Sequence, residues 1–157
     1  MTSDVLPVWF ANWAWSLPLI VFCIFIHVLG LAFIQDKVVH NLAIFLDMHH
    51  ALFSFPVIMA ITALLATALH GIEAITWAIA YGLLDALPDY KSAMLYSLGA
   101  MTTYGHANHE IADRWQLMGS LEALNGMLLF GLTTAYLFAV MQHIWLTGRR
   151  PDSRDPR

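Results

Sequence analysis

Three long apolar stretches leave this chain very few possible folds. Residues 14–34 read AWSLPLIVFCIFIHVLGLAFI, with one histidine and no charged side chain. Residues 51–84 form a second apolar stretch, interrupted by one proline, one histidine and one glutamate, and residues 115–146 form a third. A helix needs about 20 apolar residues to cross the hydrocarbon core of a bilayer, and each stretch is at least that long. The sequence therefore predicts an all-α integral membrane protein with three transmembrane helices.

The composition supports this fold class and excludes several functions. Of the 157 residues, 59% are hydrophobic and 11% are charged, whereas about 25% are charged in a typical soluble domain. The net charge of −4 comes without any block of basic residues, so we expect membrane lipid and no nucleic acid as a partner. No Ser-His-Asp arrangement, phosphate-binding loop or HExxH zinc pattern occurs, and we expect no enzymatic activity.

A short helix followed by a polar run separates the second and third spans. In LDALPDYK, residues 84–91, Pro88 and Asp89 suit the first turn of a new helix, where proline fits the backbone and an acidic side chain faces the positive end of the dipole. The pattern predicts a helix over residues 89–102, about four turns long and too short to span. The polar run MTTYGHANHE follows at residues 101–110. A short helix and irregular backbone at membrane depth form a re-entrant loop, which needs protein or water around it.

The cationic side chains predict the orientation. The C-terminal tail GRRPDSRDPR holds four arginines and Lys37 follows the first span, whereas the opposite side offers only Lys91 and Arg114. Positive residues collect on the cytoplasmic side of a membrane. We therefore expect a multi-pass protein of a cell inner (plasma) membrane, with its N-terminus outside and its C-terminus in the cytoplasm.

The order of helix, short helix, Thr-Thr-x-Gly, polar exit and helix resembles the pore module of the potassium-channel superfamily. The resemblance covers about residues 64–146. AMLYSLGAMTTYGHAN resembles the pore helix and filter of that family, and HGIEAITWAIAYGLLDALPDYKSAMLYS resembles the outer helix. RWQLMGSLEALNGMLLFGLTTAYLFAVMQHIW resembles the inner helix of small bacterial members. The resemblance implies three regions: an N-terminal span and cytoplasmic loop (1–50), a pore module of outer helix, pore helix, filter and inner helix (51–146) and a cytoplasmic tail (147–157).

The resemblance implies a homotetrameric channel that conducts a monovalent cation passively. A cation in a narrow pore needs oxygens in place of its water, and four strands of backbone carbonyls supply them. The Thr103 hydroxyl would lie at the cavity end of this filter, with Thr102 packed behind it. The ion-conducting filter would consist of Thr102, Thr103, Tyr104, Gly105, His106, Ala107 and Asn108.

The filter departs from the family pattern at four positions. Tyr104 stands where the family has valine, His106 where it has tyrosine, Ala107 where it has a second glycine and Asn108 where it has aspartate. A left-handed backbone at an alanine costs about 1–2 kcal/mol, so we expect a rebuilt upper filter. Potassium selectivity, weak selectivity and a pore-fold accessory subunit that does not conduct all fit these changes.

Histidines in the polar run have two interpretations. His106 and His109 would form rings at the outer mouth of a tetramer, where protonation below a pKa near 6.5 would repel cations. A solvated histidine-rich loop fits the same residues equally well.

Several polar residues fall inside the predicted spans, where ionisable groups are costly and are by default functional candidates. His70 and Glu73 lie three residues apart on one helical face. They are gating candidates, as are Glu122 and Asn125, but we expect them rather to hold the helices together by bonding Asn125 or Glu122 of the third span. Glu122 is also a candidate to bond the filter backbone from behind or to pair with His70. Gly126 is a hinge candidate, although close packing of small residues explains it equally well.

One face of the third span is a candidate cavity wall. Apolar or small residues recur there at helical spacing, and ordinary helix packing explains the same stripe. The candidate lining residues are Ala123, Met127, Phe130, Thr134 and Met141.

A membrane metalloprotein or haem protein is the rival class. The chain has eight histidines, and HANHE places two of them beside Glu110. Haem ligation by His27 and His70 is one version of this reading, which rests on their shared position in spans. No repeated histidine box completes a di-iron site. The channel interpretation itself needs no cofactor beyond the permeant ion.

Overall fold

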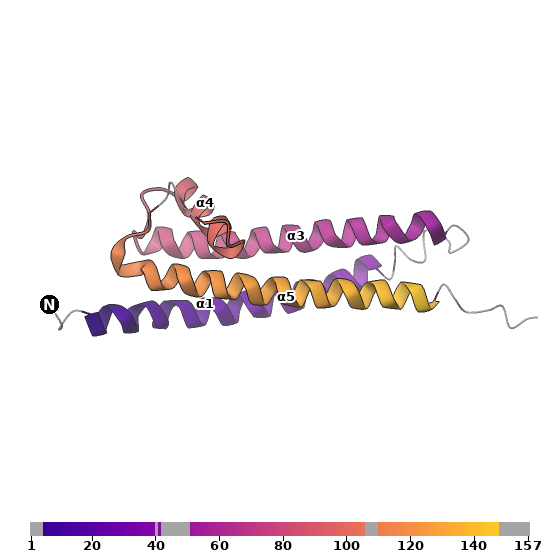
Figure 1. The fold of residues 1–157 in the computed structure, drawn as a ribbon, viewed down its shortest axis with the longest axis horizontal. Helices are drawn as coiled ribbons and strands as arrows, with labels where there is room; N and C mark the ends of the chain where they lie inside the picture. The colour runs from indigo at the N-terminus through magenta and orange to yellow at the C-terminus, as the bar shows by residue number, and fades with distance from the viewer. Residues whose placement is uncertain (1–4, 40, 42–50, 106–109, 148–157) are drawn as a thin grey trace, which may run out of the picture.

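Three long helices form the body of the protein. The computed structural model describes residues 5–39, 41, 51–105 and 110–147. Within them, α1 (Val5–Phe33), α3 (Ala51–Leu83) and α5 (Gln116–Thr147) lie side by side along one axis (Figure 1). All three are long and apolar enough to cross a membrane, and the described residues contain no strand. The all-α fold with three candidate spans is confirmed, as expected of a multi-pass membrane protein.

The first helix is longer than its apolar core predicted. It starts at Val5 and passes directly into a π-helix, η1 (Ile34–Val39). Ile34 and Val39 are buried against α1 and α3, while the Lys37 ammonium lies 2.9 Å from the exposed carboxylate of Asp36. The polar residues after the first span therefore begin as a continuation of the helix, whose first and last residues in this segment still pack against apolar neighbours.

A fourth helix, α4 (Tyr90–Met101), matches the short helix expected over residues 89–102. Its N-cap is Asp89, whose carboxylate accepts hydrogen bonds from the Ser92 backbone N–H at 2.9 Å and the Ser92 hydroxyl at 2.8 Å. The first bond gives a partner to a backbone N–H that has none within the helix, and together the two bonds fix where the helix begins.

Small residues let α4 lie directly against α3 and α5. A Cβ on Gly82 of α3 would contact the ring of Tyr90, and a Cβ on Gly119 of α5 would contact the Tyr96 hydroxyl. A Cβ on Gly126 would lie 2.3 Å from the carbonyl oxygen of Met101. The last residue of α4 is therefore level with a point ten residues into α5, which is about 15 Å along that helix.

The chain then returns to the end of the bundle from which α4 started. The Ala112 N–H donates to the Ala86 carbonyl at 3.0 Å, and the 3₁₀ turn η3 (Asp113–Trp115) leads into α5. Figure 1 shows α4 beside the end of the bundle where α3 finishes and α5 begins. Ala86 before α4 and Ala112 after it thus lie at the same end of the bundle.

Buried polar side chains connect the helices through an otherwise apolar interior. Near the start of α5, Asn12 of α1 donates to the Arg114 carbonyl at 2.7 Å and accepts from the Met118 N–H at 2.9 Å. Asn12 is buried, so these bonds provide partners for polar atoms that lipid cannot solvate. They tie α1 to the beginning of α5.

Candidate functional site

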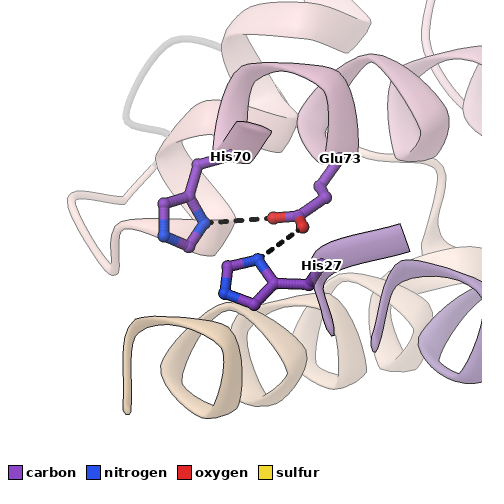
Figure 2. Close-up of side chains that lie close together, drawn as sticks. All are labelled: His27, His70 and Glu73. Atoms are coloured by element: carbon purple, nitrogen blue, oxygen red, sulfur yellow. Dashed lines mark hydrogen bonds and ion pairs between the residues drawn. The ribbon is translucent and has the colours of Figure 1, made fainter. Parts of the chain in front are cut away.

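Four polar side chains meet where α1, α3 and α5 come together. We call them the histidine–glutamate cluster: His27 of α1, His70 and Glu73 of α3, and Thr133 of α5. The side chains of His27 and Glu73 are fully buried, and that of His70 is 12% exposed. Figure 2 shows the Glu73 carboxylate between the two imidazoles. Such a group inside a candidate membrane span is costly unless its members satisfy one another.

The contacts of the cluster form a closed ring. His27 Nδ1 lies 2.7 Å from one carboxylate oxygen of Glu73, and His70 Nδ1 lies 3.0 Å from the other. The Nε2 atoms of both histidines lie 3.0 Å from the hydroxyl oxygen of Thr133. Each side chain therefore bonds two others, and all four are held in place from both sides.

Hydrogen counting restricts the protonation of this ring. When both Nδ1–H groups donate to the Glu73 carboxylate, both Nε2 atoms are left facing Thr133, whose hydroxyl has one hydrogen. The four contacts need four hydrogens. One imidazole with hydrogens on both nitrogens beside the Glu73 carboxylate supplies them, and so do two neutral imidazoles beside a protonated Glu73. The cluster as a whole is neutral in both arrangements.

The cluster also contacts α5 through an aromatic ring. His70 stacks on Phe130 of α5, with ring centroids 4.4 Å apart and an angle of 23° between the planes. The side chain of Phe130 is itself 42% exposed. The exposed edge of His70 therefore lies beside a residue of the candidate cavity stripe.

The partners expected for His70 and Glu73 from the sequence are wrong. Neither residue bonds Asn125 or Glu122; they bond each other, His27 and Thr133. The two histidine rings lie 5.1 Å apart centre to centre, with both Nδ1 atoms directed at Glu73. In this arrangement both Nδ1 atoms face Glu73 and both Nε2 atoms face Thr133, and haem ligation by the two histidines stays a hypothesis.

Glu122 belongs to a separate buried group with Tyr81 and Ser97, which we call the Glu122 cluster. The Tyr81 hydroxyl donates to Glu122 Oε2 at 2.6 Å, Ser97 Oγ is hydrogen-bonded to Oε1, and the Ser97 hydroxyl lies 2.9 Å from the Ala74 carbonyl. Three contacts need three hydrogens, and they are available when Glu122 is a carboxylic acid that donates to Ser97. Glu122 therefore holds α3, α4 and α5 together through side chains, and it bonds neither His70 nor the described backbone of the expected filter.

Asn125 and Gly126 lie close to this second group. Asn125 is fully buried and lies beside Cys23 of α1. Gly126 is buried under the backbone of Met101, which gives it a packing role. Its role as a hinge stays a prediction.

The first part of the expected filter lies on the surface of the single chain. Thr102, Thr103, Tyr104 and Gly105 are exposed, Tyr104 at 92%. Thr103 and Gly105 have positive φ angles of 57° and 93°, and the Gly105 N–H donates to the Gly99 carbonyl at 3.2 Å. The remaining filter candidates, His106, Ala107 and Asn108, lie outside the described residues, as does His109.

The expected cavity stripe is uncovered in the single chain. The side chains of Met127, Phe130, Thr134 and Met141 are exposed, Met127 at 55%, and Ala123 is half-buried. None of these five is in the buried interior that joins the three long helices. The stripe is free to face lipid, a cavity or another copy of the chain.

Comparison with known proteins adds no family. Searches with protein-family models, curated proteins and solved structures found no match to this chain. What the protein does must therefore be inferred from its own geometry.

Proposed function

We propose that four copies of this chain form a cation channel whose pore module consists of α3, α4, the polar run and α5. The observation that carries the proposal is the position of the α4 C-terminus. It lies about 15 Å along α5, beside Gly126, and it delivers an exposed Thr-Thr-Tyr-Gly segment to that depth. The hydrocarbon core is about 30 Å thick, so this segment would lie inside it.

Exposed irregular backbone at that depth needs other copies around it. Lipid cannot satisfy free carbonyl and N–H groups, so non-helical backbone occurs in membranes only where protein or water surrounds it. One chain leaves Thr102–Gly105 uncovered. A closed ring of copies around one axis would supply both the cover and carbonyl oxygens from all sides.

The local backbone suits a filter of carbonyl oxygens. Thr102 is right-handed, at φ −87° and ψ −1°, whereas Thr103 and Gly105 are left-handed. Glycine adopts positive φ without penalty, while Thr103 does so at a cost that function would justify. The permeant species would be a monovalent cation, potassium or a less selective mixture.

The proposed orientation opens the filter toward the outer face. The end of the bundle with α4 holds Lys91 and Arg114, whereas Lys37 lies toward the other end, and the four tail arginines follow Thr147 in the sequence, where α5 ends. The positive-inside rule then gives an outer N-terminus and a cytoplasmic C-terminus in a cell inner membrane. The exposed stripe of α5 would line the cavity below the filter, with Phe130 or Met141 as its narrowest point.

Ion flux into liposomes, with potassium and sodium compared, tests the proposal. Cys23 is the only cysteine, so a Cys23→Ser background allows single cysteines to be placed. Tyr104→Cys puts a thiol at the proposed filter, and Tyr90→Cys puts one at the exposed start of α4. A charged thiol reagent should stop flux through the Tyr104→Cys protein and leave the Tyr90→Cys protein conducting.

Threonine removal and oligomer size complete the test. Thr103→Ala should change the ratio of potassium to sodium flux, because it deletes an oxygen at the base of the filter. A tetramer in nanodiscs that passes no cation would identify a non-conducting accessory subunit, and a stable monomer would refute the pore altogether.

A further inference from the structure

We propose that the histidine–glutamate cluster binds a transition-metal dication of the Zn²⁺ class. The ligand atoms would be the Nδ1 atoms of His27 and His70 and a carboxylate oxygen of Glu73. One ligand atom from each residue lies within 4.8 Å of the other two. Two helices, α1 and α3, would share the metal, and α5 would support it.

The distances are close to those of a tetrahedral site. Zinc bonds of about 2.0–2.1 Å to nitrogen and oxygen place neighbouring ligand atoms about 3.3–3.4 Å apart. The two nitrogen–oxygen contacts are 2.7 and 3.0 Å, each to a different oxygen of Glu73, and the ligand atoms of the three residues lie within 4.8 Å of one another. Rotation of the Glu73 carboxylate and of the imidazoles would bring one oxygen and both Nδ1 atoms to bonding distance of a shared ion.

The donor set selects the kind of metal. Imidazole nitrogen suits Zn²⁺ and its neighbours in the first transition series, whereas Ca²⁺ and Mg²⁺ prefer sites made of oxygen. Three protein ligands leave one tetrahedral position for water or another small ligand, as in zinc sites that are not closed.

Thr133 is placed to support such a site from outside. With Nδ1 on the metal, each imidazole carries its hydrogen on Nε2, and both Nε2 atoms lie 3.0 Å from the Thr133 hydroxyl oxygen. That oxygen has two acceptor positions, so it can accept from both rings at once. Groups that orient metal-bound histidines in this way commonly change affinity 10- to 100-fold when removed.

Access to the cluster is through His70. Its side chain is 12% exposed, whereas His27 and Glu73 are fully buried. A metal ion would therefore arrive along the edge of α3 beside Phe130, where the His70 ring stacks. This site requires only the fold of one chain and does not depend on ion conduction.

Metal content of purified full-length protein in nanodiscs, with any affinity tag removed, tests the site. The parent protein for the test has glutamine in place of the six histidines outside the cluster, namely His40, His49, His50, His106, His109 and His143. Equilibrium dialysis against Zn²⁺ should give one ion per chain. Co²⁺ should give the intense visible bands of a four-coordinate ion.

Substitutions within the cluster should abolish binding in the same parent. His27→Gln, His70→Gln and Glu73→Gln should each remove the bound zinc and the cobalt bands, and Thr133→Val should weaken binding about 10- to 100-fold. Absence of zinc and cobalt binding from a parent that melts like the wild type would overturn the proposal, as would binding that survives all three ligand substitutions.

If the six-histidine parent does not fold, the wild-type chain serves instead. His70→Gln should then lower the bound zinc by one ion per chain, while His143→Gln should leave it unchanged. Equal zinc content in the two variants would refute the site.

Discussion

The substitution Gly126→Ala should push the end of α4 away from α5. A Cβ there would lie 2.3 Å from the Met101 carbonyl oxygen, 2.6 Å from its Cα and 2.8 Å from its carbonyl carbon. All three atoms belong to the backbone, so no side-chain rotation can relieve the contact. Restoring an ordinary contact of 3.4 Å would displace the end of α4 by 1.1 Å, the difference between 3.4 and 2.3 Å.

Gly131 supplies the matched control for this change. A Cβ at Gly131, on the same helix, meets nothing within 4 Å. Alanine favours a helix over glycine by about 1 kcal/mol, and this gain is common to both variants. The difference between them therefore isolates the overpacking cost, which is about 1–3 kcal/mol.

Thermal unfolding in detergent measures that difference, with tryptophan fluorescence as the signal. At about 2–4 °C per kcal/mol for a chain of this size, Gly126→Ala should melt roughly 2–12 °C below Gly131→Ala. Equal melting temperatures would refute the close approach of Met101 to α5. If the proposed channel is correct, Gly126→Ala should also reduce flux, because the displaced residue immediately precedes the filter.

Three further substitutions test the polar contacts that position the helices. Ser97→Ala removes a hydrogen-bonding partner of the buried carboxyl of α5 and should cost about 1–3 kcal/mol, whereas Ser120→Ala, on the exposed face of the same helix, should change the unfolding free energy little. Asn12→Ala leaves the two backbone groups that it bonds near the start of α5 unpaired and should also lower the unfolding free energy by about 1–3 kcal/mol. Asn41→Ala, which removes an exposed bond, should change it little. Equal melting temperatures of the two variants would contradict the role of Asn12 in joining α1 to α5. Asp89→Ala removes the N-cap of α4 and should lower stability by about 0.5–2 kcal/mol, measured as reduced melting temperature; unchanged melting would argue against the cap.

The helices could be predicted from the sequence because local features decide them. Runs of apolar residues gave the spans, and Asp89 marked the start of α4 to within one residue. The first helix was predicted too short, since it extends nine residues before Ala14 into a less continuously apolar segment. Length and hydropathy identify the core of a span better than its ends.

The side-chain clusters could be predicted only in part. His70 and Glu73 lie three residues apart in one helix, so their contact follows from helix geometry. Their partners depend on which faces of α1 and α5 turn toward α3. In helices that are apolar on all sides, periodicity carries no information about that rotation. His27 therefore suggested a haem ligand, and Thr133, an ordinary threonine in its span, gave no signal at all.

The buried polar groups also restrict how the bundle can move. α1 is tied to the start of α5 by Asn12 and to Thr133 of α5 by His27. These points are 15 residues apart on α1, or about 22 Å along the helix. Specific bonds at two points this far apart define both the rotation and the axial position of α1 relative to α5, since apolar contact alone permits sliding. Any movement of the inner helix that opens the proposed pore must therefore carry α1 with it or break one of these ties.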